Sequence, residues 1–295
     1  MKKAKLFLYL VPALIAGCSQ ENPLSEEQYY KQVYLVGADE TTNMGMSVVE
    51  IPYNNAEEQE TFISVATGGS LNIDHDFSVT VDEAGFTSIA DYNFKYLKDD
   101  DVQYQHLEEA YYRIPHNEIT LKAGEVYARM PLYLKSSELH CDSLYALTFK
   151  ISEVSNPDDL SIRQTDTVLI QSYIFVNEYS DTYQMEGYYY RWAEGQAAGD
   201  STSVTATRSF KAVNANTVRL FHLAYTESQD NIGPYGLTLK VNDDNSLTIK
   251  SWNQLEITDG GGNWSPQKGI FNVWYNYEAD GITWQFAGTF VQSDS

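Results

Sequence analysis

Short runs of alternating apolar and polar residues, separated by turn residues, recur along most of this 295-residue chain. Alternation places every second side chain on the same face of an extended strand. Residues 77–81 and residues 145–151 show the pattern clearly. Strands this short and this regularly spaced predict an all-β fold.

The alternating pattern breaks near residues 177–181, and we place a domain boundary there. We expect an immunoglobulin-like β-sandwich over residues 31–178 and a second antiparallel β domain, a meander or small barrel, over residues 179–295. The nearly continuous apolar run at 167–176 predicts a strand buried on both faces. The segment 88–111 is predicted to be helical or irregular.

The second domain contains two sequences that are typical of hairpin turns. Asn242-Asp243-Asp244-Asn245 and Ala279-Asp280-Gly281 each lie between alternating runs, so each predicts a hairpin. The segment Asp259–Pro266 contains three consecutive glycines, and we interpret it as a flexible loop.

The N-terminal segment has the layout of a secretory signal. Lys2, Lys3 and Lys5 precede an apolar run at 6–16, which is shorter than the roughly 20 residues that a bilayer span needs. The sequence that follows, Ile15-Ala16-Gly17-Cys18, resembles a bacterial lipobox, in which the cysteine thiol is lipidated and the chain is cut before it. We therefore expect a signal peptide at 1–17, a lipidated tether at 18–30, and attachment to a membrane through Cys18.

The chain is strongly acidic, with 41 Asp and Glu against 19 Lys and Arg and a net charge of −22. Such a charge repels phosphate backbones, so nucleic acid is excluded as a partner. With Cys18 lipidated, Cys141 has no partner for a disulfide. Its neighbours provide His140 but also Asp142, and we expect a partly buried structural thiol rather than a nucleophile.

Signatures of catalysis are missing from the sequence. It has no GxSxG, HExxH or GxxxxGK[ST] motif, and no residues mark the carboxylate pair that a glycosidase requires. Asp74-His75-Asp76 could ligate a metal, but adjacent residues of a strand point to alternate faces. We expect no enzyme activity, no cofactor and no metal. Calcium in the acidic turns 99–101 and 243–244 stays an open alternative.

Aromatic residues suggest a binding function, because the apolar faces of sugar rings stack on exposed Trp and Tyr. In the run 271–277, alternation places Trp274 opposite the apolar face, whereas Trp284 shares its face with Ile282 and Phe286 and is expected in the core. For each candidate, packing under a neighbouring element is the alternative. The predicted ligand-binding residues are Trp252, Trp264, Trp274, Asn272 and Asn276.

Three segments of the first domain, YYRIPHNEITLKAGE, MPLYLKSSEL and YALTFKISEVSN, resemble the N-terminal domain of Bacteroidales lipoproteins known as domain of unknown function 1735. The second half, from YSDTYQMEGYYYR to GITWQFAGTFV, resembles domain of unknown function 4361. The matching positions in the first domain are Tyr112, Pro115, Ile119, Leu121, Gly124, Glu125, Leu147 and Ile151.

This resemblance implies an immunoglobulin-like first domain and an envelope lipoprotein of a polysaccharide-utilisation system. We therefore expect a non-catalytic lipoprotein of the outer membrane, on its surface or periplasmic face, that binds a polysaccharide or oligosaccharide. The alternative is an accessory lipoprotein that docks on an outer-membrane transporter complex without binding glycan itself. A glycoside hydrolase is the third hypothesis.

Overall fold

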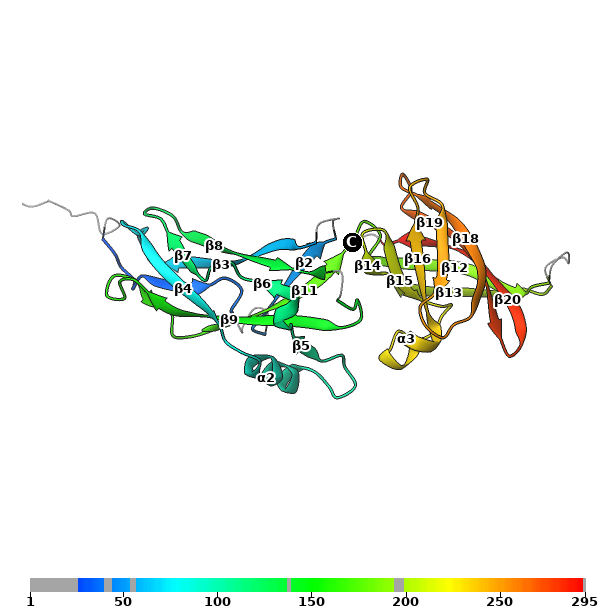
Figure 1. Ribbon diagram of the computed structural model, residues 1–295, viewed down its shortest axis with the longest axis horizontal. Helices are drawn as coiled ribbons and strands as arrows, with labels where there is room; N and C mark the ends of the chain where they lie inside the picture. The colour runs from blue at the N-terminus through cyan, green and yellow to red at the C-terminus, as the bar shows by residue number, and fades with distance from the viewer. Residues whose placement is uncertain (1–25, 40–43, 54–56, 137–138, 194–198, 294–295) are drawn as a thin grey trace, which may run out of the picture.

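The computed structural model describes two β domains that follow one another along the long axis of the molecule (Figure 1). The predicted lipidation site, Cys18, and most of the predicted tether lie outside the described residues. The described residues are 26–39, 44–53, 57–136, 139–193 and 199–293.

The first domain is a sandwich of two mixed sheets. In order across the first sheet, its strands are β10 (Ser161–Ile162), β1 (Gln32–Leu35), β3 (Gln59–Gly68), β8 (Tyr127–Leu134) and β6 (Tyr112–Arg113). Those of the second sheet are β2 (Met46–Pro52), β11 (Val168–Val176), β9 (Leu144–Val154), β4 (Phe77–Glu83) and β7 (Glu118–Leu121), and β5 (Tyr104–His106) also pairs with β9.

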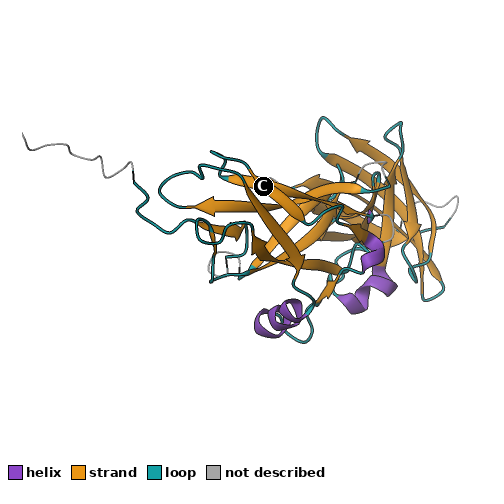
Figure 2. Cartoon of the chain, turned by 60° about the vertical axis from the view of Figure 1, so that its left-hand side comes forward, coloured by secondary structure: helices purple, strands orange, loops and turns teal. Residues whose placement is uncertain are grey.

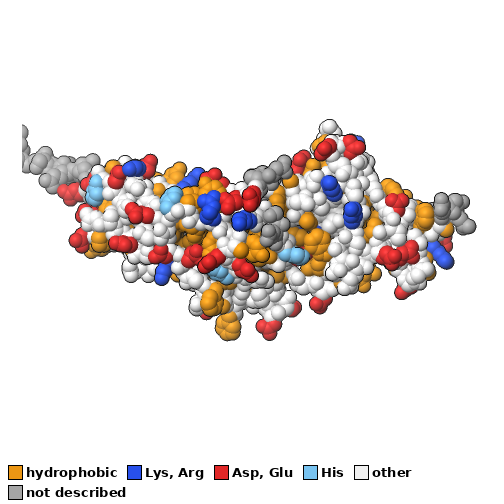
Figure 3. Space-filling view, viewed as in Figure 1, with side chains coloured by type: hydrophobic (Ala, Val, Ile, Leu, Met, Phe, Trp, Pro, Cys, Tyr) orange, Lys and Arg blue, Asp and Glu red, His pale blue; other side chains and the backbone are white. Residues whose placement is uncertain are grey.

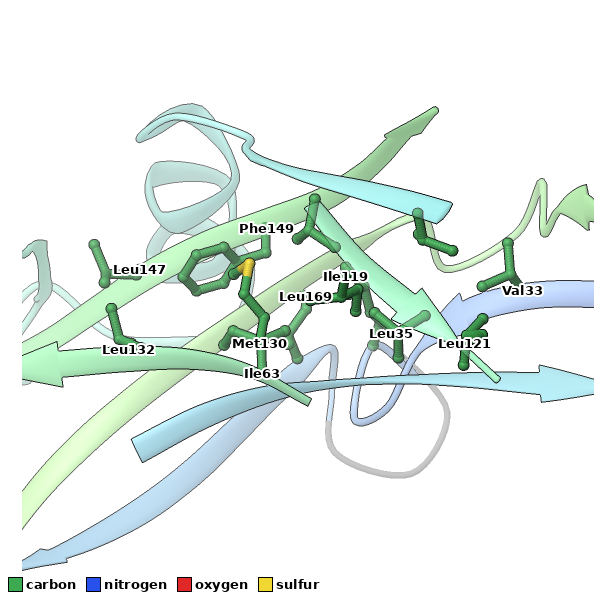
Figure 4. Close-up of a cluster of buried hydrophobic side chains, with 14 of the residues drawn as sticks. Val33, Leu35, Ile63, Ile119, Leu121, Met130, Leu132, Leu147, Phe149 and Leu169 are labelled. Carbon is green, nitrogen blue, oxygen red and sulfur yellow. The ribbon is translucent and has the colours of Figure 1, made fainter. Parts of the chain in front are cut away.

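The two sheets bury one apolar core between them, to which both contribute every second side chain. Figure 4 shows part of this core, where Ile63 and Met130 of the first sheet meet Phe149 and Leu169 of the second. The other face of the second sheet is covered by helix α2 (Thr87–Tyr96), whose Ile89 packs in a small cluster with Ile170. Strand β11 is therefore buried on both faces over residues 169–173, whereas Ile174 is 42% exposed, so the prediction for 167–176 is confirmed only in part.

The segment 88–111, predicted to be helical or irregular, contains most of α2, the short strand β5 and a 3-10 helix at Glu109–Tyr111, joined by irregular chain. Figure 2 shows how little of the chain is helical compared with the strands of both domains.

The second domain is an antiparallel meander in two ladders, in which most strands pair with the next one in the chain. The last strand pairs with the first, which closes the meander into a small barrel around a single core. One ladder contains β13 (Thr202–Ser209), β12 (Thr182–Arg191), β20 (Ile282–Gln292), β19 (Ile270–Ala279) and β18 (Ile257–Ser265). The other contains β14 (Lys211–Asn214), β15 (Thr217–Phe221), β16 (Gly236–Val241) and β17 (Leu247–Ser251), with helix α3 (Gln229–Tyr235) between β15 and β16.

Both predicted hairpins are confirmed. Asn245 has a φ of 63° in the turn between β16 and β17, and Asp280 and Gly281 have φ of 51° and 70° between β19 and β20. In the second turn, positive φ at both central residues gives the twist that antiparallel strands require.

The predicted flexible loop at 259–266 is wrong, because most of this segment belongs to strand β18. Its glycines permit close contact between strands instead of mobility. Gly262 has a φ of +145°, and a Cβ there would overlap the carbonyl oxygen of Asn272 on β19. A Cβ on Gly260 would lie 2.9 Å from the Cβ of Tyr275. Strand pairing thus overrides the turn propensity of glycine.

Acidic side chains are spread over both domains on the face shown in Figure 3. Within the described part of the chain, neither helix has the length and apolar character needed to cross a bilayer.

Candidate functional site

Strand register in the second domain brings two large aromatic side chains onto one outward sheet face. Tyr188 on β12 pairs with Ala287 on β20, and Ala287 pairs with Trp274 on β19. Directly paired residues share a face, so these three form a row across the strands, which we call the aromatic row. Since neighbouring strands lie about 4.8 Å apart, Tyr188 and Trp274 are separated by two strand spacings, about 10 Å.

Both aromatic side chains of the row are partly open to solvent. Tyr188 is 48% exposed and Trp274 is 37% exposed. The Trp274 ring lies over Gly261 of β18, since a Cβ on Gly261 would be 3.5 Å from the indole Nε1. Tyr188 is stacked on Tyr190, with 6.0 Å between ring centroids and 21° between ring planes. Each ring is thus supported on one side.

Polar side chains flank the aromatic row on both sides. One neighbouring row, which we call the polar row, contains Glu186, Thr289 and Asn272. In the row on the other side, the Tyr190 hydroxyl donates to Gln285 Oε1, and Gln285 Nε2 donates to Asn276 Oδ1 at 2.8 Å. The surface therefore combines apolar rings with hydrogen-bonding groups within one or two residue spacings.

Two of the predicted binding residues, Trp274 and Asn272, lie on this face as the alternation predicts. Asn272 is exposed and donates weakly to Asn263 Oδ1 at 3.5 Å. Asn276 points to the same face but is only 4% exposed, and its Oδ1 already accepts from Gln285. The structure therefore contradicts direct ligand binding by Asn276, which instead helps to hold Gln285.

Trp264 is a second correction, because it belongs to the core and not to a loop. It is 7% exposed, its ring lies 4.2 Å from the Phe271 ring, and its edge meets Tyr179 at 5.9 Å. Such a ring has no open face on which a sugar could stack. The error follows from the mistaken loop at 259–266, since register places Trp264 opposite Phe271 on the inner face.

Trp252 is far from the aromatic row in the fold, since it lies at the junction of the two domains. Its ring meets the edge of the His140 ring of the first domain at 5.4 Å. The predicted cluster of Trp252, Trp264 and Trp274 therefore does not form. The inward assignment of Trp284 is confirmed: it packs, partly buried, against the barrel core and meets Tyr189 edge-on.

Sequence reasoning missed Tyr188 and Tyr190. The signal was present, because Tyr183, Met185 and Tyr189 lie on the inner face, and alternation then turns positions 188 and 190 outward. Three consecutive tyrosines concealed which of them the core uses.

A buried ion cluster joins the domains. Asp142 of the first domain has a side chain only 2% exposed, and its Oδ1 forms an ion pair with Arg219, which is 1% exposed. The same oxygen lies 3.1 Å from Lys211 Nζ. Gln229 also donates to the Asp142 carbonyl oxygen at 3.3 Å. We call the group of Asp142, Arg219 and Lys211 the interdomain clamp.

The interdomain clamp bears on whether His140, Cys141 and Asp142 can bind a metal ion or act in catalysis. Their ligand atoms lie within 4.8 Å of one another, a spacing suited to a metal ion. However, two cations already neutralise the carboxylate and would repel a third. Burial raises the pKa of the Cys141 thiol, so it lacks the thiolate character of a metal ligand or nucleophile. The arrangement is better suited to joining domains than to chemistry.

His75 behaves as a surface residue. Its Nδ1 lies 2.7 Å from Asp74 Oδ1, whereas Asp76 turns away to pair with Lys122 at 2.7 Å. Lys122 donates a hydrogen bond to Asp76, which lowers the pKa of that carboxyl. The three side chains therefore do not converge on one point.

The fold defines a two-domain all-β protein whose second domain carries an exposed sheet face with two aromatic side chains. Two family models match the chain in this order: a model described as a "-like, N-terminal domain" over residues 29–158, and one described as "-like, C-terminal" over residues 166–291. The chain carries the paired N-terminal and C-terminal domains that these models describe. No curated protein matches it in a sequence comparison.

Solved structures from Bacteroides share this architecture. A Bacteroides ovatus protein of unknown function has a TM-score of 0.65 and 14% identity over 89% of this chain and 94% of its own. A multidomain Bacteroides ovatus protein including DUF1735 has a TM-score of 0.62 and 14% identity, over the same shares. An auxiliary nutrient binding protein from Bacteroides thetaiotaomicron has a TM-score of 0.60 and 15% identity over 87% of this chain and 93% of its own. At such identities the likeness establishes the fold alone.

Proposed function

We propose that this protein is a non-catalytic glycan-binding lipoprotein of the cell envelope, and that the glycan lies across the aromatic row. The observation that carries the proposal is the exposed pair Tyr188 and Trp274, separated only by the small Ala287 and flanked by the polar row. The two rings lie on one sheet face, and grouped apolar side chains at a surface mark interaction sites.

The chemistry of the face matches that of a sugar chain. The apolar C–H face of a pyranose can stack on each ring, and burial of apolar area contributes on the order of 1–3 kcal/mol for a fully covered side chain. Rings about 10 Å apart contact more than one sugar unit, which favours a polymer over a single monosaccharide. Glu186, Thr289 and Asn272 provide a carboxylate, a hydroxyl and an amide for the sugar hydroxyls.

One structure with the same fold is described as an auxiliary nutrient binding protein, which supports a binding role in this chain as well. A glycan that the cell takes up as food is one kind of nutrient. The match carries no information on which glycan this chain would bind.

Affinity electrophoresis and calorimetry against a panel of plant, host and microbial polysaccharides test the proposal. Trp274→Ala should weaken binding about 10- to 100-fold, since each factor of ten corresponds to about 1.4 kcal/mol. Tyr188→Ala should act in the same direction. Tyr127→Ala is a matched control, because Tyr127 is 54% exposed but lies in the first domain. Binding that survives Trp274→Ala and Tyr188→Ala together would remove the aromatic row as the site.

Anchoring through Cys18 is part of the same proposal and rests on the lipobox-like sequence. Mass spectrometry of protein extracted from membranes should find acyl chains on Cys18 at the new N-terminus. Cys18→Ser should leave the protein unacylated. An unmodified Cys18 in membrane-extracted protein would refute the anchor.

Docking on an outer-membrane transporter complex is the second candidate function, and a different surface favours it. On the outer face of the first sheet, the Arg129 guanidinium lies 4.0 Å from the Phe62 ring centroid, and Phe62 and Tyr127 are 42% and 54% exposed. Arginine and aromatic side chains dominate the binding energy of many protein interfaces. Co-purification of a transporter with the tagged protein, lost in Phe62→Ala/Tyr127→Ala, would favour this candidate over glycan binding.

A further inference from the structure

A cavity of about 650 Å³ lies where the two domains meet. Its walls come from the ends of β2, β9 and β11 in the first domain and from β13 and β14 in the second. This volume falls in the range of roughly 300–1,000 Å³ that is usual for small-molecule sites, which often lie between domains. Thr182 on its wall precedes Tyr188 by six residues on β12, about 20 Å along the strand. The cavity is therefore separate from the aromatic row.

Aromatic rings form much of the cavity wall on the first-domain side. Tyr53 and Phe175 lie with ring centroids 5.5 Å apart, and Tyr145 is close to both the cavity and Tyr53. The two hydroxyls are held by main-chain groups: Tyr53 donates to the Ser136 carbonyl at 3.3 Å, and Tyr145 accepts from the His140 N–H at 3.2 Å. The rings are thus fixed before any ligand arrives, which lowers the entropic cost of binding.

Polar groups of both signs complete the wall. Lys211 contributes an ammonium, Glu50 and Asp181 contribute carboxylates, and Ser143 and Ser209 contribute hydroxyls. A charged ligand would meet at least one group of its own sign here. A neutral ligand rich in hydroxyls can donate to the carboxylates and accept from the ammonium at once, and its apolar face can cover the rings.

The interdomain clamp keeps the cavity open. Lys211 lies on the cavity wall and pairs with Asp142, and Asp142 is in turn held by the buried Arg219. Asp142 belongs to the first domain and both cations belong to the second, so these ion pairs fix the two walls relative to each other. The cavity is therefore a feature of the folded chain with both domains docked.

We propose that this interdomain cavity is a second ligand site, which takes a neutral monosaccharide or disaccharide. The cavity is too small for a polymer to lie in it. The site does not depend on glycan binding at the aromatic row.

Saturation-transfer NMR and calorimetry with a panel of neutral monosaccharides and disaccharides test the site on the full folded protein. Ser209→Trp and Ser143→Trp each place a large ring in the cavity, from opposite domains, and leave the clamp residues unchanged. Each should weaken saccharide binding at least tenfold at unchanged melting temperature. Thr120→Trp, at an exposed position of β7, is the matched control and should bind as the wild type does. Glucuronic acid should bind more weakly than glucose.

Trp274→Ala separates this proposal from the proposed function. It should weaken polysaccharide binding but leave disaccharide binding within about twofold, whereas Ser209→Trp should do the reverse. The cavity proposal is overturned if no saccharide in the panel binds the wild type. It is also overturned if both cavity-filling variants bind normally, or if Trp274→Ala alone abolishes disaccharide binding.

Discussion

Asp142→Asn tests whether the interdomain clamp makes the second domain depend on the first. The substitution preserves shape but removes the carboxylate that forms ion pairs with both Arg219 and Lys211. Arg219 is 1% exposed and cannot regain water, so its charge stays buried without its ion-pair partner. Removing one partner of a buried ion pair destabilises proteins by about 3–5 kcal/mol. We expect a loss of that size in the free energy of unfolding.

Tryptophan fluorescence during urea unfolding is a suitable assay, because every tryptophan lies in the second domain while Asp142 lies in the first. A lower urea midpoint in the fluorescence signal therefore reports coupling across the junction. The tryptophans are Trp192, Trp252, Trp264, Trp274 and Trp284.

Two further variants complete this test. Asp159→Asn, at an acid with a side chain 57% exposed, should leave the midpoint unchanged. Asp142→Leu combined with Arg219→Met should recover more than half of the loss, because an apolar pair leaves no buried charge behind. A fluorescence midpoint for Asp142→Asn equal to that of the wild type would refute the coupling, whatever happens to the first domain.

Three other predictions follow from single residues. Trp264→Ala and Trp284→Ala should each destabilise the second domain, and Trp264→Ala should cost about 3–5 kcal/mol because its side chain is buried. Trp274→Ala should change the free energy of unfolding by less than about 1 kcal/mol in the same urea assay. The opposite order would reverse our assignment of these side chains to the inner and outer faces. Gly262→Ala should cost about 3 kcal/mol or more, since its Cβ would overlap Asn272, whereas Gly281→Ala, with φ of +70° but open space, should cost about 1–2 kcal/mol. Burial, aided by Arg208, lowers the pKa of His222 to about 3, so the unfolded state binds the proton first. The contribution of His222 to the free energy of unfolding should be fully present above pH 6.5, and it should fall by about 1.4 kcal/mol per pH unit between pH 6 and pH 4. His222→Gln should remove this slope. The exposed control His116→Gln should retain it.

Local patterns predicted the parts of the fold and site that depend on local geometry. Alternation assigned Trp274 outward and Trp284 inward correctly, because the two-residue period of a strand is a property of the strand itself. The turns at 242–245 and 279–281 were predictable for the same reason.

Features that depend on contacts between residues far apart in the chain could not be predicted from local sequence patterns. Trp264 was misplaced because its neighbouring glycines indicate a loop, and only the contact with β19 makes them a strand. Asp142 and Arg219 are 77 positions apart, and neither carries a local sign of the other. The interdomain cavity likewise exists only once both domains are docked.

Closure of the barrel determines where strand β20 ends. Because β20 pairs with β12, Ser293 donates to the Thr182 carbonyl and Gln292 donates to Asp181, at the entrance of the second domain (Figure 1). The end of the described chain thus returns to the waist of the molecule, beside the interdomain cavity. The Asp280-Gly281 turn precedes the other end of the 11-residue strand β20, roughly 33 Å from Gln292 along that strand. A reporter inserted directly after Ser293 would therefore sit near the first domain, whereas one inserted between Asp280 and Gly281 would sit at the far end of β20.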